Sequence, residues 1–256
     1  MLALTHVPSP SLPRCQLTYV PAAPIDLARA ASQHEAYRRA LQDCGVEVRV
    51  LDVNRDDPDG VFIEDTAVML DEVAVLGSMG TPARRAELAG VEPVLREYRR
   101  DIRRIEPPAT LEGGDVLRVG RRLLVGLSCR TNAAGVAVFA EIVRPFGYTV
   151  EAVPLRGCLH LKTACTALDE QTLIVNPAWL DVNDLPPGFR HVAVPDDEPW
   201  AANVLPIGGS ILLAAGQDRT TDLIRRVGFD VRPVDISEFA KAEGGVTCLS
   251  ILLGTD

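Results

Sequence analysis

The chain has 256 residues, of which 47% are hydrophobic and 24% are charged, and this is enough apolar material for one substantial core or two smaller ones. The formal net charge of -9 argues against binding to nucleic acid or to an anionic membrane surface, and it suits a cationic small molecule. No apolar run reaches the ~20 residues of a membrane-spanning helix and the first residues lack a signal-peptide pattern, so we expect a cytoplasmic protein.

The first part of the chain predicts a strand, a helix and a second strand. The strands are expected at 1–7 and 46–53, and the apolar residues of 26–44 have helical spacing. Gly45 is a natural stop for that helix. The segment 8–13 contains three prolines and two serines, which predicts a loop.

Four hairpins follow, each made of two apolar strands and a short turn. They are predicted at 61–76, 115–127, 161–175 and 203–215. Helices are expected after three of these hairpins, at 81–101, 131–146 and 218–227, each ahead of a further strand. No helix is predicted after the third hairpin. A short helix at 237–243 and a strand at 249–253 complete the predicted elements.

The hairpin, helix and strand recur roughly every 40–50 residues, a period typical of propellers and other repeat architectures. The fifth unit has a single strand at the C-terminal side, and the N-terminal strand would complete it and close a ring. We therefore predict an α/β fold: a five-bladed αβ-propeller of ββαβ repeats with pseudo-fivefold symmetry around a central channel. Residues 1–256 would form one catalytic domain.

Such a ring places the start of every hairpin at the central channel. Glu64, Asp65, Glu112, His160 and Cys248 all lie at or near these starts. A cysteine, a histidine and carboxylates in one channel indicate nucleophilic catalysis with acid–base assistance. The carboxylates are unfavourable for a thiolate unless the substrate is itself cationic, which points to a guanidinium or amidinium group.

Other interpretations of these residues apply when each is taken alone. A cysteine beside an apolar strand, such as Cys248, is more often a core residue than a catalytic one. A histidine between two leucines is usually a core side chain whose hydrogen bonds are made within the protein. Cys158, His160 and Cys165 have no common zinc spacing, so we do not predict a structural metal.

Several stretches together resemble one known family, the dimethylarginine dimethylaminohydrolases of the guanidine-modifying pentein superfamily. They cover nearly the whole chain in the expected order: FIEDTAV at 62–68, TLEGGDVL at 110–117, GLSCRTN at 126–132, LHLK at 159–162, VPDD at 194–197, AAN at 201–203 and TCLS at 247–250. The resemblance implies a five-bladed pentein propeller. It also implies hydrolysis of Nω-methylated L-arginine to L-citrulline and a methylamine without a cofactor.

The resemblance assigns catalytic roles to three residues. Cys248 would be the nucleophile, His160 the general acid and base, and Glu112 the group that supports the histidine. Two positions depart from relatives: Cys129 stands where several have lysine, and Leu249 where some have a second cysteine.

The resemblance also assigns substrate-binding residues. They are Asp65 and Glu64 at the guanidinium, Asp59 at the amino-acid end, Arg130 at the carboxylate, Arg85 near it, and Leu12 in a lid at 8–17. The adjacent Arg84 leaves the choice between the two arginines open.

The expected partner is a small cationic amino acid, and a homodimer is left open. The alternatives within the superfamily are an arginine deiminase, a citrulline or other ureido hydrolase, and an amidinotransferase. An alternative of another class is a non-catalytic propeller that binds an arginine-like ligand.

Overall fold

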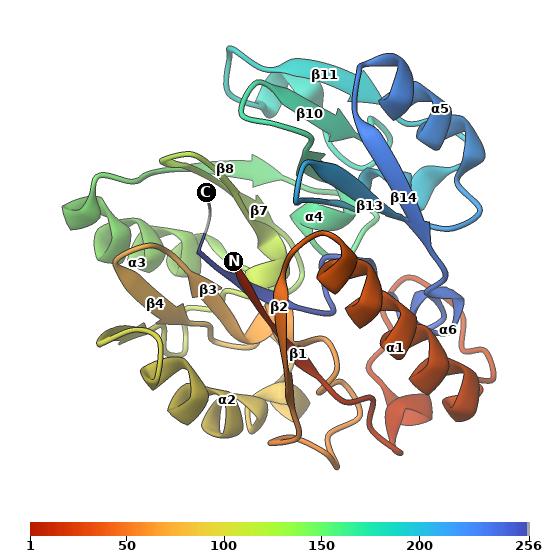
Figure 1. Cartoon of the computed structure of the whole chain (residues 1–256). Coiled ribbons are helices and arrows are strands. Elements are labelled where there is room, and N and C mark those ends of the chain that lie inside the picture. The colour runs from red at the N-terminus through yellow and green to blue at the C-terminus, as the bar shows by residue number, and fades with distance from the viewer. Residues whose placement is uncertain (255–256) are drawn as a thin grey trace.

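The computed structural model of the chain describes residues 1–254 and contains five three-stranded sheets with helices on their outer sides (Figure 1). In each sheet the inner strand pairs antiparallel with the middle strand, which pairs parallel with the outer strand. The five inner strands all contribute to the wall of a central channel. The predicted five-bladed αβ-propeller is therefore confirmed.

Each sheet runs from an inner strand at the channel to an outer strand at the rim. In that order, the N-terminal half contributes β3 (Ala67–Met69), β4 (Val73–Leu76) and β5 (Asp101–Arg104), then β6 (Val116–Val119), β7 (Arg122–Leu127) and β8 (Thr149–Pro154). The C-terminal half contributes β9 (Cys165–Ala167), β10 (Thr172–Val175) and β11 (Arg190–Ala193), then β12 (Val204–Ile207), β13 (Ser210–Ala214) and β14 (Asp230–Val234). The remaining sheet contains β15 (Ile251–Leu253), β1 (Leu2–His6) and β2 (Glu47–Leu51).

Four longer helices lie outside the sheets, and two helices are short, one of them near the centre of the ring (Figure 1). They are α1 (Leu27–Asp43), α2 (Glu87–Arg96), α3 (Ala133–Val143), α5 (Asp218–Arg226), α4 (Leu161–Ala164) and α6 (Ser237–Ala240). The start of α1 follows from Asp26, whose carboxylate accepts hydrogen bonds from the N–H groups of Ala28 and Arg29. Gly45 follows the helix with φ +79°, a conformation that glycine adopts without strain.

The inner strands start later than the sequence predicts, because a helical turn precedes four of them. These turns are Ile63–Thr66, Gly113–Asp115, α4 and Pro199–Ala202. The predicted strand starts at 61 and 161 are therefore wrong. The turns direct the polar residues of the hairpin starts toward the centre of the ring, while the strands that follow supply apolar core residues.

Two further elements differ from the prediction. The strand β11 was not predicted, because it is an outer strand whose residues are largely exposed and show no apolar alternation. The helix α2 begins at Glu87 rather than 81, and residues Pro82–Arg84 form a separate 3₁₀ turn without a side-chain cap from Thr81.

The sheet of β15, β1 and β2 joins the two ends of the described chain. β1 lies between β15 and β2, and Leu4 pairs with Ile251. The Tyr37 hydroxyl of α1 lies 2.8 Å from the Ser250 hydroxyl, which ties the outer helix to the residue before β15. Within residues 1–254, every helix is too short or too polar to cross a bilayer.

Candidate active site

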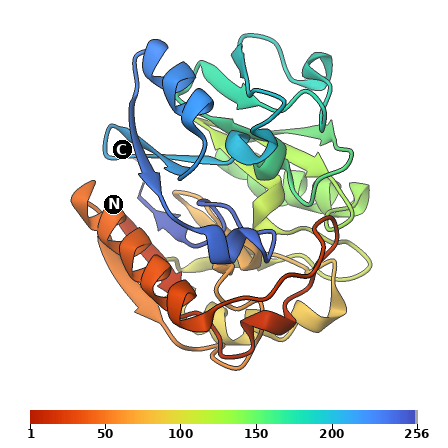
Figure 2. The same cartoon turned by 90° about the vertical axis from the view of Figure 1, so that its right-hand side faces the viewer.

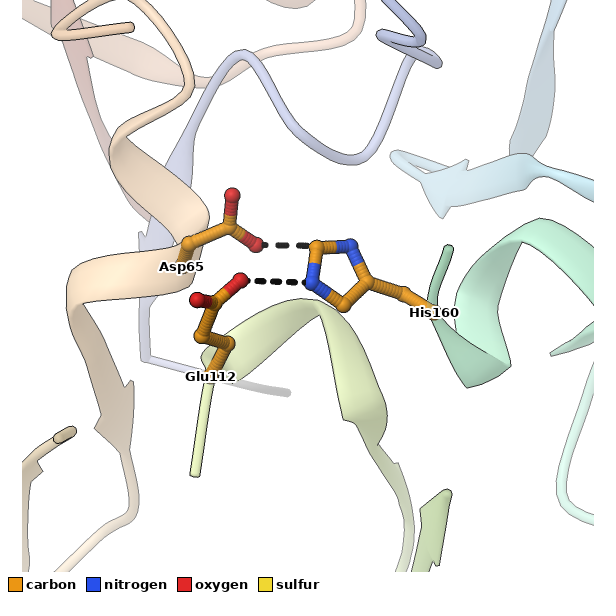
Figure 3. Close-up of side chains that lie close together, drawn as sticks. All are labelled: Asp65, Glu112 and His160. Atoms are coloured by element: carbon orange, nitrogen blue, oxygen red, sulfur yellow. Dashed lines mark hydrogen bonds and ion pairs between the residues drawn. The ribbon is translucent and has the colours of Figure 1, made fainter. Parts of the chain in front are cut away.

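Three side chains from separate blades converge at the centre of the ring (Figure 3). His160, just before α4, donates through Nε2 to Glu112 Oε2 at 2.7 Å. Its Nδ1 lies 3.7 Å from Asp65 Oδ1. All three residues are at most 3% exposed. The imidazole is thus held between two carboxylates, which favour its protonated form.

The double glycine after Glu112 explains why the blades can approach so closely. A Cβ on Gly113 would lie 2.0 Å from the carbonyl oxygen of Glu64, and one on Gly114 would lie 2.7 Å from His160 Nδ1. The Gly114 N–H also donates to Asp65 Oδ1 at 3.2 Å. Any larger residue at these positions would separate the two carboxylates from the imidazole.

Cys248 lies in the turn 246–249 ahead of β15, and that strand begins at Ile251 rather than at the predicted residue 249. The Gly245 N–H points at its Sγ from 3.3 Å, and the Thr247 hydroxyl is 4.0 Å from the sulfur. Asn203 fixes this turn, since its side chain accepts from the Thr247 N–H at 3.1 Å and donates to the Thr247 hydroxyl at 3.0 Å. The sulfur therefore has a defined position set by a neighbouring blade.

The carboxylates raise the pKa of both the histidine and the cysteine, which favours the charged form of the imidazole and the neutral form of the thiol. Burial acts to lower the pKa of His160, but Asp65, Asp115 and Glu112 outweigh it and raise that pKa to about 9. Burial, together with the charges of Glu64 and Asp65, raises the pKa of the Cys248 thiol to about 12. At neutral pH the site without substrate therefore contains an imidazolium and a neutral thiol.

Glu112 remains ionised inside this cluster. Burial acts to raise its pKa, but the hydrogen bond and the charge of His160, followed by the charges of Arg84 and Arg130, lower it below the usual value. The imidazolium and the Glu112 carboxylate thus stabilise each other's charged forms.

Glu64 lies behind the site. Its Oε1 accepts from Lys162 Nζ at 2.5 Å, and its Oε2 accepts from the Thr247 hydroxyl at 2.9 Å. With Lys162 and Thr247 it lines a channel cavity of about 350 Å³, whose other walls are mostly apolar. From the sequence we expected Glu64 to lie in the cavity beside the nucleophile, but it does not line that cavity. Its charge raises the pKa of Cys248 from outside the cavity.

A second cavity of about 20 Å³ lies beside Cys248 and His160. Its other lining residues include Gln16, Asp59, Asp65, Arg84, Arg130 and Glu243. This volume holds about one water molecule, far less than an amino-acid ligand needs. The cavity must therefore enlarge before a substrate enters. The segment Gln16–Val20, hereafter the covering segment, contributes Gln16 to its wall.

Of the two adjacent arginines, the structure brings Arg84 to the cavity. Arg84 is 3% exposed and donates to Asp65 Oδ2 at 2.6 Å and to both oxygens of Glu87 at 2.9 Å. Arg85 is exposed, and its Nε contacts the Met79 carbonyl oxygen at 3.4 Å. Of the two arginines, Arg84 therefore lines the cavity and Arg85 does not.

The other expected substrate ligands lie in different places. Arg130 is buried at the cavity, and within residues 1–254 its side chain makes only long contacts, 3.5 Å each to Glu112 Oε1 and the Thr18 hydroxyl, so its donors are available. Asp59 accepts from the Gln16 N–H at 3.1 Å. Leu12, the expected lid residue, is fully buried in a core cluster instead, and Gln16 lines the cavity.

Sequence reasoning missed three residues of the site. Asp115 is fully buried and accepts from the Leu161 N–H at 2.8 Å, which fixes the turn that carries His160. Asn203 orients the turn of Cys248, and Glu243 contacts the covering segment. Asp115 and Asn203 could have been found from the aligned hairpin starts, whereas the sequence around Glu243 shows no such signal.

Asp65, Glu112 and His160 also place one ligand atom each within 4.8 Å of one another, as a metal site would. A metal requires a neutral imidazole, but these carboxylates raise the pKa of His160 and Nε2 donates to Glu112. The arrangement thus favours proton transfer over metal binding.

Comparisons with known proteins agree with this geometry. A family model described as N,N dimethylarginine dimethylhydrolase, eukaryotic, matches residues 22–181. The N(G),N(G)-dimethylarginine dimethylaminohydrolase of Streptomyces coelicolor is 41% identical over 252 residues, which are 98% of this chain and 96% of the relative.

Two solved structures resemble the chain closely. One is the Pseudomonas aeruginosa dimethylarginine dimethylaminohydrolase, as a cysteine-to-serine mutant complexed with citrulline (TM-score 0.91, 33% identity, 98% of both chains). The other is a histidine-to-glycine variant of a dimethylarginine dimethylaminohydrolase, as an adduct with S-methyl-L-thiocitrulline (TM-score 0.90, 32% identity, 98% of both chains). The fold, the site and these matches show that the chain belongs to the dimethylarginine dimethylaminohydrolase family of the pentein superfamily.

Proposed function

We propose that the protein hydrolyses Nω-methylated L-arginines to L-citrulline and a methylamine, with Cys248 as nucleophile. The observation that carries this proposal is the anionic cavity in which a neutral thiol and an imidazolium lie among buried carboxylates. A guanidinium ion complements that charge, and the names of the similar proteins describe the same reaction. They do not favour an arginine deiminase, a ureido hydrolase or an amidinotransferase.

The two ends of the substrate would meet different groups. Asp65 would bind the guanidinium, with Arg84 fixing its second oxygen. Arg130 would bind the carboxylate through donors that now have only long contacts. Asp59, which accepts from the covering segment, would also bind the amino group.

The charge of the substrate also activates the nucleophile. Because Glu64 and Asp65 raise the pKa of Cys248, a bound guanidinium that balances their charge lowers this pKa and releases the thiol proton. Thiolate then forms mainly in the presence of a cationic substrate. This limits reactions of the free enzyme with neutral electrophiles.

The reaction proceeds in two halves. The Cys248 thiolate attacks the guanidinium carbon, and His160 donates a proton to the departing amine as the C–N bond breaks. A cationic thiouronium remains on the sulfur. Neutral His160 then removes a proton from water, whose oxygen attacks the same carbon. The C–S bond breaks, the remaining hydroxyl proton of the intermediate passes to the departing sulfur, and citrulline leaves.

Three properties remain proposals. Residues 1–256 are proposed to act as one catalytic domain, since strands from both ends share a sheet. A cytoplasmic location is supported by six free cysteines, which a reducing compartment would preserve. The homodimer that the sequence leaves open is the third of these proposals.

The first test is the substrate panel. Citrulline release should be fastest with asymmetric dimethylarginine and monomethylarginine, and slow with arginine. Cys248→Ser should abolish turnover, because a hydroxyl ionises far less readily than a thiol. Cys158→Ser and Cys165→Ser serve as buried controls that retain activity. Faster turnover of arginine, or an active Cys248→Ser, contradicts the proposal.

The second test concerns the charge on the thiol. Glu64→Gln removes a negative charge that raises the pKa of Cys248, so the pH midpoint for alkylation of Cys248 by iodoacetamide should move down. Peptide mass mapping separates Cys248 from the other cysteines. Glu151→Gln, at a half-buried residue of the outer strand β8, is the control and should leave the midpoint in place. An unchanged or higher midpoint in Glu64→Gln would disprove this electrostatic account.

The third test separates the two roles of His160. His160→Gly should not turn over dimethylarginine, whose amine cannot leave without a proton. It should still form a lasting adduct at Cys248 with S-methyl-L-thiocitrulline, because a methanethiolate leaves without that proton. Intact-mass spectrometry detects the adduct, which was the species observed in the related histidine-to-glycine variant. Normal turnover, or no adduct, would show that His160 is not the proton donor.

The fourth test concerns the substrate carboxylate. Arg130→Ala should raise the KM for monomethylarginine, since a hydrogen bond between charged groups contributes about 1.5–3 kcal/mol. It should change the KM for N-methylagmatine, which lacks the carboxylate, much less. Arg85→Ala is the matched control, because that side chain is exposed outside the cavity. Equal losses with both substrates would exclude Arg130 as the carboxylate ligand.

A further inference from the structure

Glu243 is the point at which the covering segment is attached to the rest of the site. Its Oε2 accepts from the Thr18 N–H at 2.9 Å, and its Oε1 accepts from the N–H groups of Tyr19 and of Val20, the latter at 2.8 Å. The residue is 7% exposed. Figure 2 shows the segment between β1 and α1 running beside the C-terminal residues that precede β15.

The backbone of Glu243 has an unfavourable conformation. Its φ is +61°, and among the described residues it alone has a positive φ without being glycine. A residue with a Cβ adopts this region at a cost, and such strain persists only where the surroundings enforce it. The three hydrogen bonds to the covering segment are contacts that can offset this cost.

Glu243 also belongs to the loop that positions the nucleophile. Gly245, two residues further along, directs its N–H at Cys248 Sγ from 3.3 Å. The cavity of about 20 Å³ is too small for a substrate, so part of its wall must move before one enters, and we take the covering segment, which contributes Gln16 to that wall, as the moving part. Its departure removes the contacts that hold Glu243 in its strained conformation, and the loop before Gly245 is then free to relax.

From these contacts we infer that Glu243 is a positioning residue that couples closure of the covering segment to placement of the Cys248 thiol. The inference rests on the proposed function and extends it: the thiol reaches its reactive position only when the segment has closed over the substrate. Glu243 acts through backbone N–H groups and its own loop, not through contact with the substrate.

Glu243→Gly tests the coupling, because glycine adopts φ +61° without strain and the variant keeps the fold while losing the carboxylate. We expect amide hydrogen exchange at Thr18, Tyr19 and Val20 to become roughly 10-fold to 100-fold faster, as expected when hydrogen bonds to a charged group are lost. Cys248 should also react faster with iodoacetamide, because an open covering segment exposes the buried sulfur to this small reagent, which does not need the alignment required for substrate attack. Both measurements need no substrate.

Glu198→Gln is the matched control. Glu198 is also buried, and its carboxylate accepts from two backbone N–H groups, those of Arg219 and Thr220, away from the cavity. This variant should leave the exchange of the covering segment and the alkylation of Cys248 unchanged. If Glu243→Gly also leaves either of them unchanged, the inference is overturned. This outcome does not depend on whether the wild-type protein hydrolyses methylarginines, since neither measurement uses a substrate.

Turnover separates positioning from direct contact. With a functional wild type, Glu243→Gly should lower kcat by about 10-fold to 100-fold, the scale of a misplaced reacting group. The loss should be the same for monomethylarginine and for 5-(N-methylguanidino)valeric acid, which lacks the amino group. A loss confined to monomethylarginine would show instead that Glu243 binds the substrate amino group, and the inference would be wrong.

Discussion

The structure depends on the burial of charge at the point where the blades meet. His160, Glu112 and Asp65 come from separate blades, and none is more than 3% exposed. Buried charges are strongly unfavourable unless each has a partner, so the ring is stable only when the blades bring these groups together. The glycines at 113 and 114 permit the approach, and Asp115 and Asn203 fix the turns that carry the histidine and the cysteine.

The same charges make the nucleophile dependent on its substrate. Reactive cysteines commonly have cations beside the sulfur, which lower the pKa of the thiol. Here the carboxylates of Glu64 and Asp65 raise the pKa of the Cys248 thiol instead. The cation that is needed arrives with the substrate. Selectivity for a guanidinium and activation of Cys248 therefore have one physical origin, and an uncharged ureido product loses both interactions when it forms.

Much of this arrangement is encoded locally and was predicted from the sequence. The repeated hairpins indicated the propeller, and the polar residues at their starts indicated which side chains share the centre. The helical turns at Ile63–Thr66 and α4 could not be recognised, because a single turn before an apolar strand has too few residues for a distinct period. β11 was missed because its exposed residues lack the apolar pattern of the other strands.

Prediction of the site residues from the sequence was limited for the same reason, because local patterns do not show which side chains become buried. Arg84 and Arg85 are identical in type, and only the direction of the 3₁₀ turn makes one of them buried; the spacing of Arg84 and Glu87 was the available signal. Leu12 and Gln16 both belong to an irregular segment, so their burial depends on long-range packing. Glu243 contacts residues more than 220 positions earlier in the chain, a relation that no local pattern encodes.

The sheet that combines β15 with β1 and β2 has a consequence for the protein during its synthesis. Four blades consist of consecutive segments and can form in order as the ribosome extends the chain, but this blade must wait for its last strand. Cys248 lies in the turn immediately before that strand. The nascent protein therefore assembles its acid–base partners before its nucleophile, and it acquires reactivity only when the ring has closed.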